Sequence, residues 1–286
     1  MKIGVITDCF KKTHAEGIEI AASLGLNGVQ IYATTGEFSP ESLTEKSKAE
    51  YKALLNEKGL AISALCGDMG GYGFEKAEDN PSRIAKTKKI IDLAAEFGAK
   101  VVTTHIGVIP DDKSEPRYAV MLAALTECGL YAKEKGITLA IETGPEKART
   151  LLGFLKDTKG GTGVNLDPAN FVMVTGQDPV EAVYLLKDYI VHTHAKDGIK
   201  LSDDMTLTEV YHAFAVGGVE ALNACKGFRE VPLGEGQVDW VKYISALKDI
   251  GYDGFLTIER ECGEDPTSDI LRGVTFLKNI ISRICK

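Results

Sequence analysis

Four positions along this sequence carry side chains that could hold a divalent cation between them. Each lies near the end of a short apolar run, and most of them are carboxylates. They are Glu142, Asp167, one of the pair His192 and His194, and Glu259. A mixed set of carboxylate and imidazole ligands suits Mn²⁺, Mg²⁺, Co²⁺ or Zn²⁺. Because such an ion stabilises negative charge on a substrate oxygen, these residues indicate metal-assisted chemistry.

The spacing of these positions fits one strand and one helix each. Asp167 follows Glu142 by 25 residues, and His194 follows Asp167 by 27. Glu259 follows His194 only after 65 residues, so this unit carries an insertion. An insertion that follows a strand lies over the reactive face of a barrel. We therefore expect residues 198–237 to form a lid-like insertion between the seventh strand and the seventh helix.

Apolar runs of strand length alternate with longer amphipathic segments along the whole chain. The helix-like stretch 81–98 begins at a proline and ends at a glycine, which are helix start and stop signals. The runs that we expect to be strands are residues 2–7, 28–32, 60–67, 100–107, 138–144, 162–167, 189–197 and 254–261. This alternation predicts an α/β fold, a single (β/α)8 TIM barrel over residues 1–286. An open doubly wound sheet is the alternative, weakened because ITDCFKKTH stands where a GxGxxG turn would follow the first strand.

A barrel of this kind would gather the polar strand ends on one face. The carboxyl ends of all the strands open on that face, where barrel enzymes carry their active sites. Cys66 and Asp68 at the end of the third run, and His105 at the end of the fourth, fall on the same side. Charged groups in a barrel mouth are costly unless they are paired or bound to a cation. Their number here favours a reaction site over solvated strand ends.

Composition disfavours several classes of partner. The net charge is −8, from 33 Lys and Arg against 41 Asp and Glu, and no basic block is present, so nucleic acid is a poor partner. No apolar run approaches the ~18–20 residues that cross a membrane, and MKIGVITDCF reads as a first strand rather than a signal peptide. Six scattered cysteines without a CxxC pair favour free thiols. We therefore expect a cytoplasmic protein in a reducing compartment.

Taken in order, the strand-end motifs resemble the sugar (phosphate) isomerase/epimerase branch of the xylose isomerase-like TIM-barrel superfamily. The matching pieces are THIG, IETG, NLDPAN, VHTHAKD, LGEGQVDW and TIERE. The resemblance runs nearly end to end and implies that Glu142, Asp167, His194 and Glu259 bind one divalent metal ion. It selects His194 because this residue begins the H-x-K-D pattern. Residues two apart share a strand face, so we interpret His192 as pointing inward one layer deeper.

The resemblance also implies the reaction. In the epimerases of this branch, the metal chelates the carbonyl and the neighbouring hydroxyl of an open-chain ketose. Two glutamates then remove and return a proton through an enediolate, so Glu142 and Glu259 would be catalytic as well as ligands. We expect a divalent-metal-dependent isomerase or epimerase of a keto-sugar or sugar phosphate, an enzyme of carbohydrate metabolism for which manganese is one candidate metal.

Further residues are candidates for substrate binding. His105 resembles the residue that binds a substrate hydroxyl in this family, although a histidine that merely ends a strand is an equal interpretation. Glu235 sits between two glycines that permit close approach to a ligand, and a plain turn competes with this interpretation. Cys66 would line the sugar pocket by its position alone. Lys196 either contacts substrate or pairs with a carboxylate.

Other functions stay open to different degrees. A metal-dependent dehydratase of a keto-inositol or keto-sugar would use the same site and the same proton removal, and the sequence does not separate it. A nuclease related to AP endonucleases is disfavoured by charge and because Asn170 replaces the histidine of that family's D-x-x-H motif. A binding barrel without catalysis would not need both glutamates. We expect a small-molecule sugar or sugar phosphate as partner, no nucleic acid and no membrane, and a homo-oligomer stays open.

Overall fold

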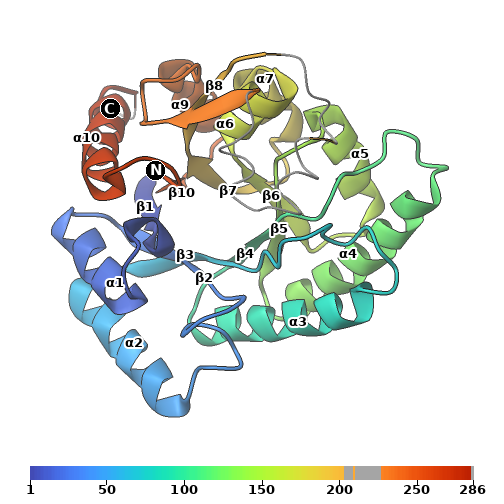
Figure 1. Cartoon of the computed structure of the whole chain (residues 1–286), viewed down its shortest axis with the longest axis horizontal. Helices are drawn as coiled ribbons and strands as arrows, with labels where there is room; N and C mark the ends of the chain where they lie inside the picture. Colours follow the sequence, from blue (N-terminus) through green and yellow to red (C-terminus); the bar gives the residue numbers. More distant parts are fainter. Residues whose placement is uncertain (203–208, 210–226, 285–286) are drawn as a thin grey trace.

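The computed structural model describes residues 1–202, 209 and 227–284. Within them, parallel strands close into a barrel in the order β1-β10-β7-β6-β5-β4-β3-β2 (Figure 1). The barrel strands are β1 (Lys2–Ile6), β2 (Gly28–Tyr32), β3 (Ala61–Cys66), β4 (Val101–Thr104), β5 (Thr138–Glu142), β6 (Thr162–Leu166), β7 (Ile190–Ala195) and β10 (Phe255–Ile258). Each overlaps one of the predicted strands, so the predicted (β/α)8 barrel is confirmed.

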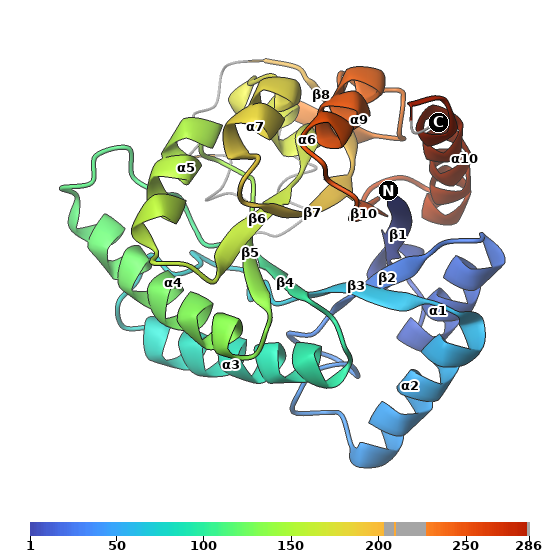
Figure 2. The same ribbon diagram turned by 180° about the vertical axis from the view of Figure 1, so that it is seen from behind.

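Helices form an outer layer around the barrel, as Figures 1 and 2 show from opposite sides. They are α1 (His14–Ser23), α2 (Glu45–Lys58), α3 (Asn80–Glu96), α4 (Pro116–Glu134), α5 (Ala148–Asp157), α7 (Pro179–Leu186), α9 (Trp240–Asp249) and α10 (Pro266–Ile284). Three short turns follow strands at their carboxyl ends: η1 (Thr7–Phe10) after β1, and α6 (Pro168–Asn170) with η2 (Phe171–Thr175) after β6. Local signals set the ends of the helices. Pro81 lies in the first turn of α3, and Gly98 follows the end of α3 with a φ of 76°. Thr13 and Glu16 form a capping box that begins α1.

Alternation along the strands separates an apolar layer from a polar interior. In β2, Val29 and Ile31 belong to the apolar core, whereas Gln30 between them makes polar contacts inside the barrel. In β6, Val164 likewise belongs to the apolar core and its neighbour Asn165 faces the polar interior. Successive strand residues point to opposite faces, which explains the separation. The interior of the barrel therefore carries hydrogen-bonding groups directly beneath its mouth.

Regular structure lies near both ends of the insertion expected at residues 198–237. Strands β8 (Asp197–Lys200) and β9 (Phe228–Val231) pair antiparallel at its base, apart from the barrel. Residues 203–208 and 210–226, which include most of the TLTEVYHAF segment, lie outside the described residues. The lid-like role of the insertion stays a prediction.

One carboxylate holds the far end of this insertion against the barrel. Asp197 accepts hydrogen bonds from the backbone N–H groups of Gly234 (2.9 Å), Gly236 (3.2 Å) and Val238 (3.2 Å), and from the indole N–H of Trp240 (2.9 Å). A Cβ atom on Gly236 would collide with the Asp197 carboxylate. The LGEGQVDW motif is therefore wound around Asp197, and the close approach that its glycine permits is to this side chain.

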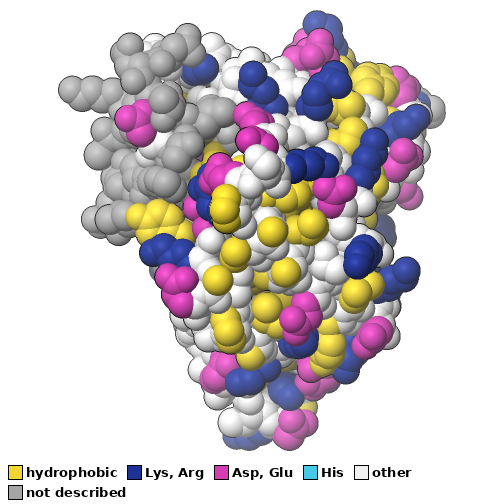
Figure 3. All heavy atoms as spheres, turned by 90° about the vertical axis from the view of Figure 1, so that its right-hand side faces the viewer, with side chains coloured by type: hydrophobic (Ala, Val, Ile, Leu, Met, Phe, Trp, Pro, Cys, Tyr) yellow, Lys and Arg dark blue, Asp and Glu magenta, His cyan; other side chains and the backbone are white. Residues whose placement is uncertain are grey.

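Charges of both signs are interspersed over the outer helices on the face shown in Figure 3. Lys88 of α3 pairs with Glu127 of α4 at 2.7 Å, and Lys113 pairs with Asp157 of α5 at 2.6 Å. Among the described residues, no helix is both long and apolar enough to cross a membrane.

Candidate metal centre

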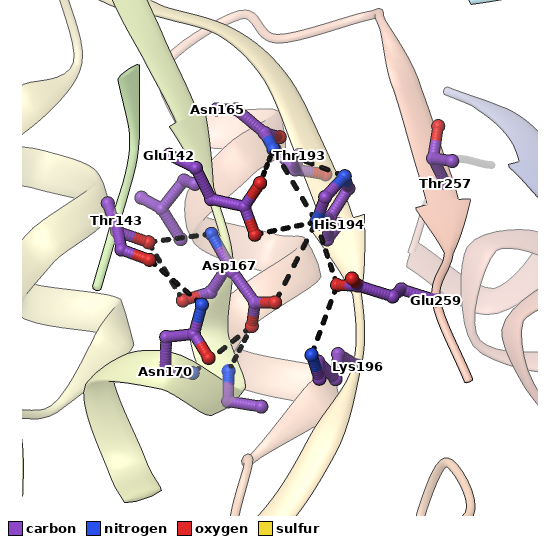
Figure 4. A network of polar contacts seen from close by, with 12 residues as sticks. Glu142, Thr143, Asn165, Asp167, Asn170, Thr193, His194, Lys196, Thr257 and Glu259 are labelled. Atoms are coloured by element: carbon purple, nitrogen blue, oxygen red, sulfur yellow. Dashed lines mark hydrogen bonds and ion pairs between the residues drawn. The ribbon is translucent and has the colours of Figure 1, made fainter. Parts of the chain in front are cut away.

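The side chains implied as metal ligands converge at the carboxyl ends of four neighbouring strands (Figure 4). Glu142 ends β5, Asp167 follows β6, His194 lies in β7 and Glu259 follows β10. One ligand atom from each residue lies within 4.8 Å of those from the other three. All four side chains are buried. The arrangement is a compact set of oxygen and nitrogen donors of the kind that divalent cations bind.

The imidazole of His194 stands among the three carboxylates. Its Nδ1 lies 3.0 Å from Glu259 Oε2, 3.2 Å from Glu142 Oε1 and 3.8 Å from Asp167 Oδ2. Three buried carboxylates at these distances repel one another strongly, because little water is present to screen their charges. A positive charge among them is needed to stabilise the group.

Asp167 provides a test of whether these residues fit a cation. Its Oδ1 accepts from the backbone N–H groups of Ala169 (2.8 Å) and Asn170 (3.1 Å), which caps α6. Its Oδ2 is buried and receives no hydrogen bond from the residues that the structure describes. A buried carboxylate oxygen that accepts no hydrogen bond is costly, and a cation beside Nδ1 of His194 would satisfy it. The donor set therefore fits a divalent metal ion.

A glutamine in β2 contacts the nitrogen of His194 that lies away from the carboxylates. Nε2 of His194 lies 3.1 Å from Gln30 Oε1, which can only accept, and 3.1 Å from Asn165 Nδ2, which can only donate. A cation at Nδ1 would need the lone pair of that nitrogen, so the metal-bound ring would keep its hydrogen on Nε2, where Gln30 Oε1 can accept it. Gln30 Nε2 donates to Thr103 Oγ1 (3.1 Å), which holds the amide in this orientation. Partners of this kind orient metal-binding histidines. Sequence reasoning missed Gln30, and the available signal was one amide inside the apolar run GVQIY.

The electrostatics of the group follow from burial and from its neighbours. Burial raises the pKa of Asp167. Burial also opposes ionisation of Glu259, but the charges of Lys196 and His194 outweigh it and lower the pKa of Glu259. For His194, burial favours the neutral ring, yet Glu142 and Glu259 raise its pKa well above the usual value. A cation at Nδ1 must displace that proton, so protons and metal compete for this site.

Lys196 pairs with carboxylates at the edge of the group. Its Nζ lies 2.8 Å from Glu261 Oε2 and 3.4 Å from Glu259 Oε2, and its side chain is buried. Burial would lower its pKa, but Glu259 and Glu261 raise it well above the usual value, so Lys196 stays charged. Of the two interpretations made from the sequence, the structure therefore shows the pairing of Lys196 with carboxylates. A substrate contact by Lys196 stays a hypothesis.

His105 and Cys66 lie on the Glu142 side of the mouth. His105 follows β4, and its Nδ1 lies 3.8 Å from Glu142 Oε2. Burial would lower the pKa of His105, but nearby Asp68 and Glu142 raise it. Cys66 ends β3 beside β4, and burial, reinforced by Asp68, raises the pKa of its thiol well above the usual value. A neutral thiol and a partly exposed imidazole could both contact a polar ligand there.

Two other residues bear on the predictions from sequence. Glu235 is exposed, and its N–H donates to the carbonyl of Pro232 (3.0 Å) within the turn around Asp197, so a ligand contact by Glu235 stays a prediction. Asn170, which stands where a nuclease would carry a histidine, donates from Nδ2 to the carbonyl of Thr143 (2.9 Å). That amide therefore fastens α6 to the segment after β5.

Sequence reasoning also missed Glu146, which follows IETG in the loop after β5. Its side chain is 5% exposed, and neither carboxyl oxygen has a hydrogen-bond partner among the described residues. Burial raises the pKa of Glu146 to about 7, against the opposing charge of His105. A carboxyl group of this kind is partly protonated at neutral pH and can donate a proton as well as accept one. The signal in the sequence was a second glutamate four residues after Glu142.

Comparison with known proteins agrees with this architecture. Uncharacterized protein YfiH of Bacillus subtilis (strain 168) is 24% identical, over 99% of this chain and 100% of its own. The xylose isomerase domain protein of Planctomyces limnophilus superposes with a TM-score of 0.80 at 27% identity, covering 99% of this chain and 98% of its own.

Two more distant structures share the fold. The probable 3-DHS dehydratase AsbF of Bacillus anthracis has a TM-score of 0.76 at 20% identity, over 98% of this chain and 99% of its own. The D-psicose 3-epimerase of Clostridium cellulolyticum H10 has a TM-score of 0.73 at 14% identity, over 98% and 99%. The sequence pattern of the xylose isomerase-like TIM barrel family matches residues 18–280, most of the chain. The chain belongs to the xylose isomerase-like TIM barrel family.

Proposed function

We propose that this protein is a divalent-metal-dependent isomerase or epimerase of a keto-sugar or sugar phosphate. The observation that carries the proposal is the buried convergence of Glu142, Asp167, His194 and Glu259 at the barrel mouth. The resemblance of the strand-end motifs to sugar isomerases and epimerases supports the same function. So does the similarity in fold to a D-psicose 3-epimerase.

The four residues would hold the metal ion in a site that excludes bulk water. When bound, the ion supplies Lewis-acid stabilisation of the negative charge that develops on a substrate carbonyl oxygen. Asp167 and His194 would act as ligands only. Their positions are maintained by the cap on α6 and by Gln30, respectively.

Glu142 and Glu259 would move the proton. In the strand order β5-β6-β7-β10 they stand at opposite ends of the arc that carries the four residues, so a substrate between them meets a carboxylate on either side. The charges of Lys196 and His194 lower the pKa of Glu259 and keep it ionised, the form in which it can accept a proton from the carbon beside the carbonyl. Glu142, protonated from solvent, would donate a proton to the other face of the enediolate, and Glu259 would release the proton it took to solvent. Glu142 Oε2 accepts a hydrogen bond from Asn165 (3.2 Å).

Proton exchange with solvent tests this assignment. A panel of ketoses, free and phosphorylated, would be incubated with the metal-loaded protein in D2O and followed by NMR. Wild type should incorporate deuterium beside the carbonyl, and Glu259→Gln should lower the exchange rate by about 10²–10⁴-fold. Glu264→Gln, the same change at an exposed glutamate of the following loop, is the control. Exchange retained in Glu259→Gln would remove this residue from the mechanism.

A dehydratase acting on a keto-inositol or keto-sugar is the second candidate, and Glu146 is the observation that favours it. Loss of water needs an acid to protonate the departing hydroxyl, and Glu146 is a buried carboxyl with a pKa near 7. The products separate the two functions. An epimerase yields a ketose labelled at one carbon, whereas a dehydratase yields an unsaturated ketone and water.

A further inference from the structure

Beneath the metal centre, a chain of hydrogen bonds runs across the barrel from β10 to β5. Thr257 Oγ1 donates to His192 Nε2 (3.0 Å), His192 Nδ1 donates to Asn165 Oδ1 (2.9 Å), and Asn165 Nδ2 donates to Glu142 Oε2 (3.2 Å). Figure 4 shows Asn165 directed toward Glu142. All four side chains are buried. A buried chain of this kind is stable only if every member finds its partner.

The chemistry of the atoms allows one direction for this chain. Asn165 Oδ1 can only accept, so the hydrogen of the His192 ring sits on Nδ1. Nε2 is then the acceptor, and the hydroxyl of Thr257 donates to it. The nitrogen of that amide faces Glu142 Oε2, which can only accept, and it also lies 3.1 Å from Nε2 of His194. The carboxylate of Glu142 and the Nδ1 hydrogen of His192 therefore favour the same direction of the amide.

The orientation of Glu142 follows from that of the amide. Its Oε2 is drawn toward Asn165, and its Oε1 is left 3.2 Å from Nδ1 of His194, inside the metal centre. If the Asn165 amide turned over, its oxygen Oδ1 would face the carboxylate of Glu142. The repulsion between these oxygens would push Glu142 out of place. The direction of the amide therefore controls which carboxylate oxygen enters the site.

We propose that His192 is a positioning residue, which acts through Asn165 to fix the carboxylate of Glu142 toward the cation and the substrate. This inference rests on the proposed metal centre. It explains why two histidines stand two residues apart in β7. The rings of His192 and His194 meet edge to face at 5.7 Å, one orienting a ligand and the other serving as one. A histidine that only filled the core would need its shape and not its Nδ1 hydrogen.

Three substitutions distinguish the hydrogen bond from the shape. In His192→Asn, the amide nitrogen can take the place of Nδ1 and donate to Asn165. In His192→Gln, the amide nitrogen reaches the place of Nε2 instead, and in His192→Phe the ring stays without its nitrogens. The readouts are the affinity for Co²⁺ by competition with a chelator, and the visible spectrum of bound Co²⁺, which reports how the ion is coordinated.

We expect wild type and His192→Asn to bind Co²⁺ with similar affinity and similar spectra. His192→Phe and His192→Gln should bind up to about 10–100-fold more weakly and with altered spectra, since this is the range for loss of a direct partner of a metal ligand and His192 acts on Glu142 through Asn165. His14→Phe is the matched control, because His14 is also a buried imidazole bonded to a threonine, Thr7 (3.0 Å). It should lower the melting temperature and leave Co²⁺ binding unchanged.

Equal affinity and equal spectra in His192→Gln and wild type would overturn the inference, and so would an Asn variant that behaves like the Gln variant. The Asn and Gln pair decides the question even if the Phe variant fails to fold. Wild-type protein that binds no Co²⁺ at all would overturn the metal centre itself. That failure is distinct, since it appears before any substitution is made.

Discussion

Asp167 has a different task for each of its two carboxylate oxygens, and one substitution separates them. Oδ1 caps α6 by accepting from the N–H groups of Ala169 and Asn170, while Oδ2 faces His194 without a hydrogen bond from the described residues. Asparagine keeps an oxygen for the cap and puts an amide nitrogen, which does not bind cations, in the place of Oδ2. We expect Asp167→Asn to keep the stability of the metal-free protein and to lose its stabilisation by metal.

The size of the effect follows from binding to the folded state only. At a metal concentration of 100 times Kd, a ligand stabilises the fold by about 2.7 kcal/mol. In a domain of this size each kcal/mol shifts the melting temperature by about 2–4 °C, so wild type should gain about 5–11 °C. Asp167→Asn should gain little. Since burial raises the pKa of Asp167, its charge is costly in the metal-free fold, and asparagine there should not lower stability.

Thermal unfolding by circular dichroism tests this, first after treatment with EDTA and then during titration with Mn²⁺ or Mg²⁺. Asp167→Ala is the companion variant, because it removes the cap as well. It should lower the metal-free melting temperature by about 2–4 °C for a cap worth about 1 kcal/mol. A full metal-induced shift in Asp167→Asn would refute Asp167 as a ligand. A metal-free Asn variant as unstable as the Ala variant would refute the division of tasks between the two oxygens.

Three further substitutions probe contacts around the site. Gln30→Leu removes the acceptor for Nε2 of His194 and should weaken Co²⁺ binding about 10–100-fold in chelator competition. Unchanged binding would show that Gln30 does not orient the His194 ring. Asp197→Ala leaves four backbone N–H groups and the Trp240 indole without their acceptor. It should cost at least about 3 kcal/mol of unfolding free energy in urea, followed by the fluorescence of the single tryptophan of the chain. A change within experimental error would contradict the anchoring role. Burial raises the pKa of Glu146 to about 7, so the wild-type fold loses stability as pH rises above the pKa that this residue has in the unfolded chain. Glu146→Gln removes this ionisation. The variant should therefore exceed wild type by about 3 kcal/mol at pH 8 and differ little near pH 4.5, and equal stability at both pH values would show that Glu146 ionises freely.

Strand positions were predictable because the signals for them are local. Every barrel strand overlaps its predicted run, yet the fourth run was expected to extend to residue 107 and β4 ends at Thr104. His105, Asp167 and Glu259 all stand just beyond the last residue of their strands. The chain leaves the sheet there to bring these side chains over the barrel mouth. Hydrophobic patterning cannot show where hydrogen bonding between strands stops, because the apolar run continues past that point.

The amino-acid order alone determined that eight alternating units form a barrel and that carboxylates and imidazoles stand at one of its ends. Both features depend on periods of a few residues, which neighbouring positions specify. Only the tertiary structure decided which groups hold these side chains in place. Gln30 meets His194 across 164 residues of sequence, and His192 reaches Glu142 through Asn165 of another strand. Such contacts depend on the register in which the barrel closes, which is set by the packing of the whole chain and not by any short stretch of it.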